Sequence, residues 1–270
     1  MPELPEVETT VRGLTPVLGG QRLTRVVANR ADLRRAMPVD LGQRLTGATV
    51  TGLRRRAKYG LIDTDRGDTL IFHLGMSGRW RVDPVERLVH DHLELSTANG
   101  RQVVLNDPRR FGSIDLMPTA EVATWPPFVA LGPEPLGPDF TADHLRQRFA
   151  GRIAPIKLLL LDQRIVAGLG NIYVCEALNV ARIAPTRPAG QVAPERLSAL
   201  VDATRAVLLA AIEAGGSTLR DYARPDGELG YFSKQFRVYG REGEACPCGG
   251  VVERRVDGGR STFWCARCQR

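Results

Sequence analysis

The first part of the chain, to about residue 115, alternates apolar and polar residues with the period of a β-strand. Turn residues separate the alternating or β-branched segments, which are "RLTRVVAN", "TGATVTGLRRR", "GDTLIFHLGMSGRWRV", "DHLELSTANGRQVVLND" and "FGSIDLMP". One helix is expected before them, because Pro5 suits a first turn and Val7, Val11 and Leu14 share one face. Short strands at this spacing predict a sandwich or a barrel that follows an N-terminal helix.

The pattern changes after residue 115. Residues 116–140 contain "WPPFVALGPEPLGPDF", which has too many prolines and glycines for a regular element and is expected to be an interdomain linker. Helical periodicity then runs through "TADHLRQRFAG", "APIKLLLLDQ", "GNIYVCEALNVA" and "APERLSALVDATRAVLLAAIEAG". Thr141 and Asn171 are the expected N-caps of two of these helices.

A glycine-rich polar loop, "GGSTLRDYARPDGELGYF", and a short basic tail follow the helices. The order of segments predicts an α+β multidomain protein. Its expected parts are a β domain at 1–115, a linker at 116–140, a helical domain at 141–235 and a tail domain at 236–270.

Composition adds a partner class to this picture. No stretch of about 18 apolar residues and no leader with a cleavage site is present, so a soluble, cytoplasmic protein without membrane contact is expected. The net charge of +7 is typical of a protein with a polyanionic partner such as nucleic acid, and a basic housekeeping protein is the alternative that charge alone leaves open. Lys58, Lys157 and Lys234 are the lysines of an arginine-rich chain, which makes each a candidate for a role that guanidinium cannot fill.

The cysteines are concentrated in the tail. Two close pairs flank a hairpin-length spacer, as in a zinc ribbon: Cys246, Cys248, Cys265 and Cys268. One structural Zn²⁺ is expected, since four protein ligands leave no open position, and a reduced tail without metal is the alternative. The first pair has one intervening residue where two are commoner. The spacer also carries arginines suited to phosphates, and Cys175 among apolar helical residues is expected in the core.

Several turns carry candidate chemistry. "DPRRFG" sets Arg109 beside Phe111, as in a duplex wedge, although the motif taken alone favours an exposed turn with a core Phe. "HLGMSG" similarly offers Met76 on a glycine-flanked turn, where packing is the default expectation. His90 and His92 lack a third ligand at a metal-binding spacing, so surface or phosphate contact is expected. "GLGNIY" opens a helix whose free N–H groups suit a phosphate, without the glycine pattern of a nucleotide-cofactor site.

Seven motifs, taken in order along the whole chain, resemble the formamidopyrimidine-DNA glycosylase family. They are "PELPEVET", "HLGMSG", "DPRRFG", "LGPEPL", "LLDQRIVAGLGNIY", "GGSTLRD…DGELGYF" and "VYGREG" with the cysteine tail. The resemblance implies an N-terminal β-sandwich with its helix, a helix–two-turn–helix domain that binds DNA, and a C-terminal zinc-finger hairpin. It also implies a monomeric, nucleoid-associated bacterial repair enzyme that acts on duplex DNA.

The same resemblance implies a reaction. The enzyme excises oxidised purines (8-oxoguanine and formamidopyrimidines) and nicks the strand at abasic sites by β,δ-elimination, through a Schiff base on Pro2 after removal of Met1. An α-amino group with a pKa near ~8 is partly unprotonated at neutral pH and can attack the sugar. Glu3 is implied as general acid/base, and Glu6 as a pocket residue that helps position the flipped nucleotide. Glu8 is expected to serve mainly the positive end of the helix.

The resemblance assigns the remaining site residues by motif. Lys58 in "RRRAKYG" is implied as an active-site proton donor. Met76, Arg109 and Phe111 match the wedge that fills the gap left by the lesion. The implied phosphate contacts are His73, Asn171 and Arg260, with Arg260 also in the catalytic set, and further His92 and Lys157. The loop from Ser217 to about Tyr222 is implied to recognise the everted base.

Two other readings of the sequence remain. A relative that prefers oxidised pyrimidines shares the scaffold, but the Met–Arg–Phe wedge and the "GGSTLRD" loop argue against it. A non-catalytic DNA-binding zinc protein would have lost Pro2, Glu3 or Lys58, and all three are present.

Overall fold

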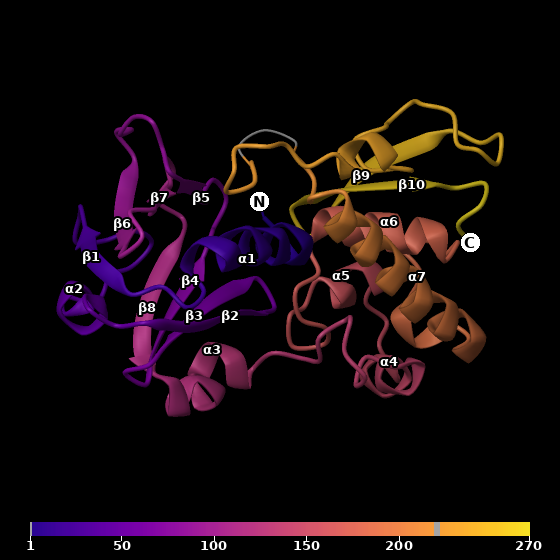
Figure 1. Cartoon of the computed structure of the whole chain (residues 1–270). Coiled ribbons are helices and arrows are strands. Elements are labelled where there is room, and N and C mark those ends of the chain that lie inside the picture. Colours follow the sequence, from indigo (N-terminus) through magenta and orange to yellow (C-terminus); the bar gives the residue numbers. More distant parts are fainter. Residues whose placement is uncertain (1, 219–221) are drawn as a thin grey trace. The chain divides into compact units, whose positions relative to one another are not determined.

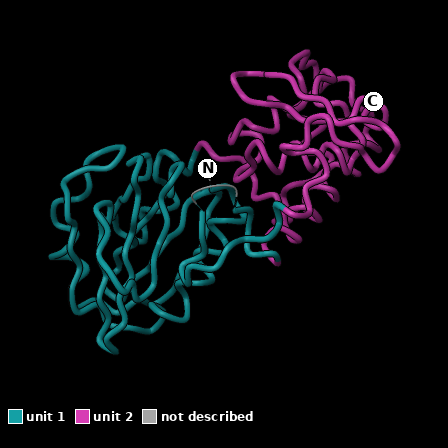
Figure 2. The backbone as a smooth tube through the Cα atoms, turned by 90° about the horizontal axis from the view of Figure 1, so that it is seen from above, with its two compact units in different colours: residues 1–129, 214–233 teal, residues 130–213, 234–270 magenta. Residues whose placement is uncertain are grey.

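The chain forms two compact units in a computed structural model that describes residues 2–218 and 222–270 (Figure 1). Unit 1 comprises the chain up to Val129 together with Ala214–Ser233, and unit 2 comprises Ala130–Glu213 and Lys234–Arg270 (Figure 2). This division differs from the predicted one. Residues 214–233 group with the N-terminal part and not with the helices, and the cysteine tail shares a unit with the helices.

Unit 1 is built on two antiparallel four-stranded sheets. The first has the order β1 (Leu23–Ala28), β6 (Asp91–Thr97), β7 (Gln102–Asn106), β5 (Arg79–Val82). The second has the order β2 (Val50–Arg56), β3 (Tyr59–Thr64), β4 (Asp68–His73), β8 (Ser113–Pro118). Because these are two separate sheets, the fold is the expected sandwich and not a closed barrel.

Both sheets contribute to one hydrophobic core. Leu93 and Leu105 from the first sheet belong to the same buried cluster as Ile62 and Phe72 from the second. The ring of Phe72 lies edge-on to that of buried Trp80, with 5.4 Å between the ring centroids. Large side chains from facing sheets therefore fill the interior, as the alternating pattern predicts.

Helix α1 (Leu4–Leu18) packs against β2, β3 and β5. Its predicted apolar face is confirmed, since Val7, Val11 and Leu14 are all buried in the core. Glu3 is the N-cap, and Glu3 and Glu6 form a reciprocal capping box that satisfies N–H groups of the first turn. The helix start therefore holds two acidic residues in fixed positions.

Two elements of unit 1 were not singled out by the pattern. Strand β3 is central, with Leu61 and Ile62 both buried, so it lacks the alternation of a half-exposed strand. Helix α2 (Leu41–Leu45) has only five residues and packs against β1.

The prediction that "WPPFVALGPEPLGPDF", residues 125–140, holds no regular element was wrong in part. A short helix, α3 (Pro126–Val129), lies within it, and a 3₁₀ helix, η1 (Thr119–Thr124), precedes it. Prolines are tolerated in a first helical turn, and buried Phe128 packs edge-on against Trp125 and Tyr59. Aromatic packing thus stabilises structure where proline content alone predicted none.

Unit 2 contains the predicted helices: α4 (Ala142–Phe149), α5 (Ile156–Leu160), α6 (Asn171–Val180) and α7 (Pro194–Glu213). Thr141 caps α4 by accepting a hydrogen bond from the His144 N–H at 3.1 Å, as predicted. The predicted cap of α6 was wrong: Gly170 is the N-cap and Asn171 is the first helical residue. Short 3₁₀ turns, η2 (Ala189–Gln191) and η3 (Phe232–Gln235), complete the helical segments.

The tail forms an antiparallel hairpin of β9 (Val252–Asp257) and β10 (Arg260–Cys265), which lies beside α6 (Figure 1). Cys175 of α6 is buried with Val238, Val252 and Phe263, so its predicted core position is confirmed. Within the described parts of the chain, no helix has the length and apolar character needed to cross a bilayer.

Candidate functional site

The N-terminal residues lead directly into α1. Pro2 and Glu3 are buried, and the Glu3 N–H donates to Glu6 Oε2 at 2.8 Å. The capping box fixes the carboxylates of both residues at the positive end of the helix, where anionic groups are stabilised. Met1 lies outside the described residues.

Glu6 joins this helix end to the returning loop. Its Oε1 accepts a hydrogen bond from the Ser217 N–H at 2.8 Å, and its backbone carbonyl accepts one from the Tyr222 hydroxyl at 3.3 Å. Burial, and the charge of Glu6, raise the pKa of Tyr222, so this hydroxyl stays a donor. Ser217 and Tyr222 therefore anchor the two sides of the predicted recognition loop, whose middle residues 219–221 lie outside the described residues.

Lys58 lies in the turn between β2 and β3, two strands against which α1 packs. Its side chain is buried, and it follows Ala57, which has a left-handed φ of 52°. Burial, and then the charge of Lys58, lower the pKa of His73 to about 4. His73 Nδ1 accepts the Gly75 N–H at 3.0 Å, so the neutral ring carries its proton on Nε2 and presents a donor there.

The two predicted wedge turns lie against each other. A Cβ on Gly75 would lie 2.3 Å from the Phe111 backbone carbon, so only glycine allows this approach. Met76 is 36% exposed and Phe111 45% exposed, while the Arg109 guanidinium lies 4.9 Å from the Phe111 ring centroid. The alternatives of a packed Met76 and a core Phe111 do not fit these exposures. The turns instead present an arginine and two apolar side chains together at the surface.

Two residues that the sequence analysis missed hold this pair of turns. The Ser77 hydroxyl donates to Asp107 Oδ1 at 2.6 Å and accepts the Arg109 N–H at 3.1 Å. Asp107 Oδ2 accepts the Gly112 N–H at 2.8 Å, and both residues are buried. Their positions in the motifs "HLGMSG" and "DPRRFG" could have identified them, since small polar side chains in turns often form hydrogen bonds with nearby backbone groups.

His92 is buried and not at the surface as predicted. Its Nε2 lies 3.0 Å from the Asp107 carbonyl oxygen, and burial lowers its pKa. The ring therefore supports the chain that carries Arg109 and Phe111. His90 is exposed, as expected.

In unit 2, Asn171 and Lys157 both bond to strand β10 of the tail hairpin. Asn171 Nδ2 donates to the Ser261 carbonyl at 2.8 Å. Lys157 Nζ donates to the same carbonyl at 3.1 Å and to the Thr262 hydroxyl at 2.8 Å. Lys157 is fully buried, and burial lowers its pKa, so it does not occupy the exposed position predicted for a phosphate contact. Arg260 is exposed at the start of β10.

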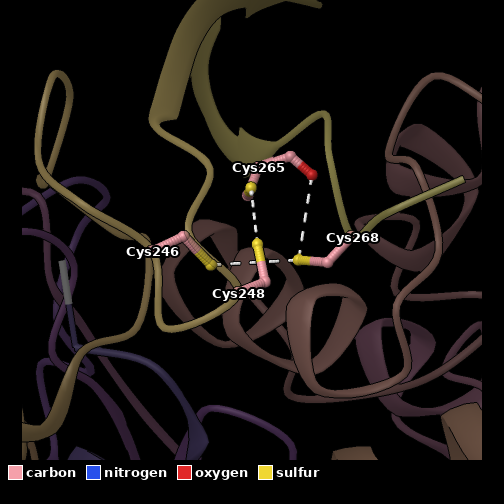
Figure 3. A group of neighbouring side chains, drawn as sticks. All are labelled: Cys246, Cys248, Cys265 and Cys268. Carbon is pink, nitrogen blue, oxygen red and sulfur yellow. Dashed lines mark hydrogen bonds between the residues drawn. The ribbon is translucent and has the colours of Figure 1, made fainter.

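The four cysteines converge at the base of the hairpin (Figure 3). The Sγ atoms of Cys246 and Cys268 lie 3.9 Å apart, those of Cys248 and Cys265 lie 3.5 Å apart, and all four lie within 4.8 Å of one another. Thiolates around tetrahedral zinc, with Zn–S near ~2.3 Å, are separated by just under ~4 Å, so the set fits this ion. Among the described residues, no other group of three or more ligands is close enough to hold a metal.

The short spacing of the first cysteine pair is accommodated by a tight turn. Cys246 donates its N–H to the Gly250 carbonyl and accepts the Gly249 N–H, each at 2.8 Å. Gly249 has a φ of 80°, which favours glycine. A backbone hydrogen bond from Gly250 lowers the pKa of Cys248 to about 7, which favours the thiolate that metals bind.

Three parts of the chain match models of known protein families. Family models match as the formamidopyrimidine-DNA glycosylase N-terminal domain at residues 1–114, the formamidopyrimidine-DNA glycosylase H2TH domain at 131–223, and a zinc finger found in FPG and IleRS at 243–270. The zinc-finger match and the cysteine cluster agree, and the tail holds one structural zinc ion.

A formamidopyrimidine-DNA glycosylase from Rhizorhabdus wittichii is 71% identical over the full length of both chains. Two solved Lactococcus lactis structures are similar over the full length of both chains. A variant in complex with Fapy-dG-containing DNA has a TM-score of 0.92 at 35% identity, and a complex with DNA containing an abasic site has a TM-score of 0.91 at 36% identity.

Proposed function

The chain belongs to the formamidopyrimidine-DNA glycosylase family and is a DNA glycosylase for damaged bases; from this premise we propose that it excises oxidised purines and then cleaves the strand. The substrate class is 8-oxoguanine and ring-opened purines in duplex DNA, and the lyase step is β,δ-elimination. The observation that carries the proposal is the buried Pro2–Glu3–Glu6 helix start, together with a buried Lys58 on a turn that Arg55 ties to the same helix.

Pro2 is the proposed nucleophile after removal of Met1. Its lone pair attacks C1′ of the damaged nucleotide, the glycosidic bond breaks, and its electron pair leaves with the base, which takes up a proton. Loss of the proline N–H proton then gives a neutral aminal. When the C1′–O4′ bond breaks and O4′ takes up a proton, the nitrogen lone pair forms the C=N bond of an iminium ion. The reference pKa of an α-amino group, near ~8, keeps part of this amine unprotonated at neutral pH. A lysine with a pKa near ~10.4 would be almost fully protonated.

Glu3 and Lys58 are the proposed proton-transfer groups. The iminium accepts electrons when a proton leaves C2′, so the bond from C3′ to its phosphate oxygen breaks, and a second elimination releases the phosphate at C5′. Glu3, fixed by the capping box, is placed to move protons on the sugar. Lys58 is the proposed proton donor, and its ammonium also suits a phosphate. Water finally hydrolyses the iminium and regenerates Pro2.

The exposed Met76, Arg109 and Phe111 are the proposed wedge. Extrusion of a base costs a few kcal/mol of stacking and pairing, which inserted side chains must offset. Two apolar side chains and an arginine on turns braced by buried Asp107 and Ser77 suit this task, because the braced backbone limits their movement. Arg109 is the proposed partner of the orphaned cytosine.

The phosphate contacts and the recognition loop complete the proposal. His73 Nε2–H, Asn171 and Arg260 are proposed to contact phosphates beside the lesion, and Arg260 also belongs to the catalytic set. The loop from Ser217 to Tyr222, anchored on Glu6, is proposed to read the everted base. His92 and Lys157 are buried, so they are given supporting roles behind the contact residues. The enzyme is proposed to act as a monomer in the bacterial cytoplasm, on nucleoid DNA.

A borohydride trap tests the chemistry. The protein is incubated with a duplex carrying 8-oxoguanine opposite cytosine, and the adduct is digested and sequenced. We expect a covalent adduct on the N-terminal peptide, and strand ends that both carry phosphate. Glu3→Gln keeps a hydrogen-bonding side chain at the cap and is expected to reduce the yield of adduct strongly.

An undamaged duplex and a duplex with an oxidised thymine are the controls. The absence of both adduct and cleavage on the 8-oxoguanine duplex would show that the catalytic proposal is wrong. Efficient cleavage of the oxidised thymine duplex alone would indicate the pyrimidine-specific alternative.

A further inference from the structure

Glu8 connects helix α1 to the turn that carries Lys58. Its Oε2 accepts a hydrogen bond from Arg55 Nε at 2.9 Å, and Arg55 Nη1 donates to the Ala57 carbonyl at 2.9 Å. The guanidinium of Arg55 thus bridges a helix carboxylate and the residue immediately before Lys58. The expectation that Glu8 serves mainly the helix end was wrong.

This connection is largely removed from water. The side chain of Arg55 is 9% exposed and that of Glu8 is 22% exposed. Arg12, which also contacts Glu8 at 2.8 Å, is 64% exposed. A buried guanidinium with fixed partners has little freedom, whereas an exposed ion pair contributes little. The Glu8–Arg55 ion pair is therefore more rigid than the Glu8–Arg12 ion pair.

The turn at Lys58 has a backbone conformation that needs support. Ala57 has a φ of 52°, a region in which side chains with a Cβ are disfavoured. Arg55 holds the carbonyl of this same residue. A change in that hydrogen bond alters the backbone directly before Lys58, so the direction of the Lys58 side chain depends on it.

We propose that Glu8 and Arg55 are positioning residues that set the Lys58 ammonium for proton transfer in the lyase reaction. Pro2, Glu3, Glu6 and Glu8 all belong to α1 or to the residues just before it, whereas Lys58 comes from the β2–β3 turn. The Glu8–Arg55–Ala57 connection ties these two parts together. This inference rests on the proposed function of Lys58.

Single-turnover cleavage of a preformed abasic site measures the effect. Glu8→Ala and the milder Arg55→Lys are the test variants, since a lysine cannot bond to both Glu8 and the Ala57 carbonyl as the guanidinium does. We expect the rate constant to fall about tenfold to a hundredfold, the loss typical of a misplaced catalytic group. The Kd for a duplex with an uncleavable abasic analogue should change by less than about threefold, because Glu8 and Arg55 are not themselves among the proposed DNA contacts.

Arg12→Ala is the matched control. This substitution removes the exposed partner of Glu8 and leaves the Glu8–Arg55 ion pair intact. The rate constant of the variant should therefore stay within about twofold of that of the unsubstituted enzyme. Thermal unfolding of each variant identifies loss of folding, and Arg55→Lys serves if Glu8→Ala does not fold.

A double-mutant cycle with Lys58→Ala separates positioning from general stability. If Glu8 acts through Lys58, adding Glu8→Ala to Lys58→Ala should slow the residual reaction by less than about twofold. Equal slowing in both backgrounds would overturn the inference, as would an unchanged rate constant in Glu8→Ala. An inactive unsubstituted enzyme would instead refute the proposed function.

Discussion

His73 is a residue whose protonation is decided by its surroundings. Burial lowers its pKa from 6.5 to about 4, and Lys58 acts in the same direction. A protein that keeps a histidine neutral when folded becomes less stable as the pH falls, because the histidine of the unfolded chain takes up a proton at a higher pH than that of the folded chain. The stability that it contributes is thus present above pH 6.5 and lost as the pH falls toward 4.

The free energy of unfolding should report this titration. Between pH 7 and pH 5 the lowered pKa corresponds to a loss of about 2 kcal/mol. His73→Asn retains an acceptor for the Gly75 N–H but does not titrate, so its loss over the same range should be smaller by that amount. Urea unfolding of both proteins at the two pH values measures the difference. Identical losses would contradict the neutral His73.

Lys157 shows that the fold decides what a motif residue can contact. The resemblance implied a phosphate contact for it, but its ammonium is buried and bonds to the Ser261 carbonyl and the Thr262 hydroxyl. The Thr262 hydroxyl in turn donates to Asp257 Oδ2 at 2.6 Å. A lysine suits this place because a compact ammonium fits between two oxygen atoms more easily than a planar guanidinium does.

At the scale of elements, two features hold the β9–β10 hairpin near its base. The cysteine cluster closes its base, and the core cluster around Cys175 packs it against α6. Buried Glu176 of α6 also accepts three backbone N–H groups, from Arg237, Val238 and Tyr239, just before the hairpin. Removal of the metal should therefore loosen the hairpin without unfolding the helices.

Chelation of zinc tests this expectation. We expect one zinc per chain, a loss of DNA affinity of at least about tenfold after chelation, and a nearly unchanged helical circular dichroism signal. Cys268→Ala should lose the metal. Cys175→Ala should keep it, because Cys175 lies outside the cluster. Full DNA affinity in the metal-free protein would contradict the role assigned to the hairpin.

At the scale of the whole molecule, the net charge of +7 should govern the salt dependence of binding. We expect the bound protein to neutralise about four to six DNA phosphates. The logarithm of the association constant, Ka, should then fall with the logarithm of the salt concentration with a slope of about −4 to −5. Lesion-containing and undamaged duplexes should give similar slopes, since phosphates carry no sequence information. Fluorescence anisotropy at several salt concentrations measures both slopes.

Arg260 provides an internal check of that slope. Arg260→Gln should reduce its magnitude by about 1, the value for one lost phosphate contact. Arg255→Gln, on the same hairpin, should change it less, because Arg255 already pairs with Asp257 at 2.8 Å. Equal changes in both variants would show that Arg260 makes no specific phosphate contact.

The division into two units also belongs to this scale. Residues 214–233 return to unit 1 because Ser217 and Tyr222 bond to Glu6, and the Pro225 carbonyl accepts the Val82 N–H at 2.9 Å. These partners are far apart in sequence. The local pattern of apolar and polar residues does not reveal contacts between distant segments. The predicted domain boundary at residue 235 was therefore placed where the composition of the chain changes.

The amino-acid sequence by itself determined the elements and the chemistry that they carry. Strand and helix periods, the apolar face of α1, the Thr141 cap and the four cysteines are local properties, because each depends on residue type and short spacing. Its motifs also indicated the family, which the comparisons bear out over the full length.

Only the tertiary structure decided which of these residues meet, which are buried and which carry protons. The contact of the two wedge turns at Gly75, the Glu8–Arg55 connection, the neutral His73 and the buried Lys157 and His92 all belong to this class. The physical reason is that burial, hydrogen bonding and pKa depend on neighbours brought together from distant parts of the chain.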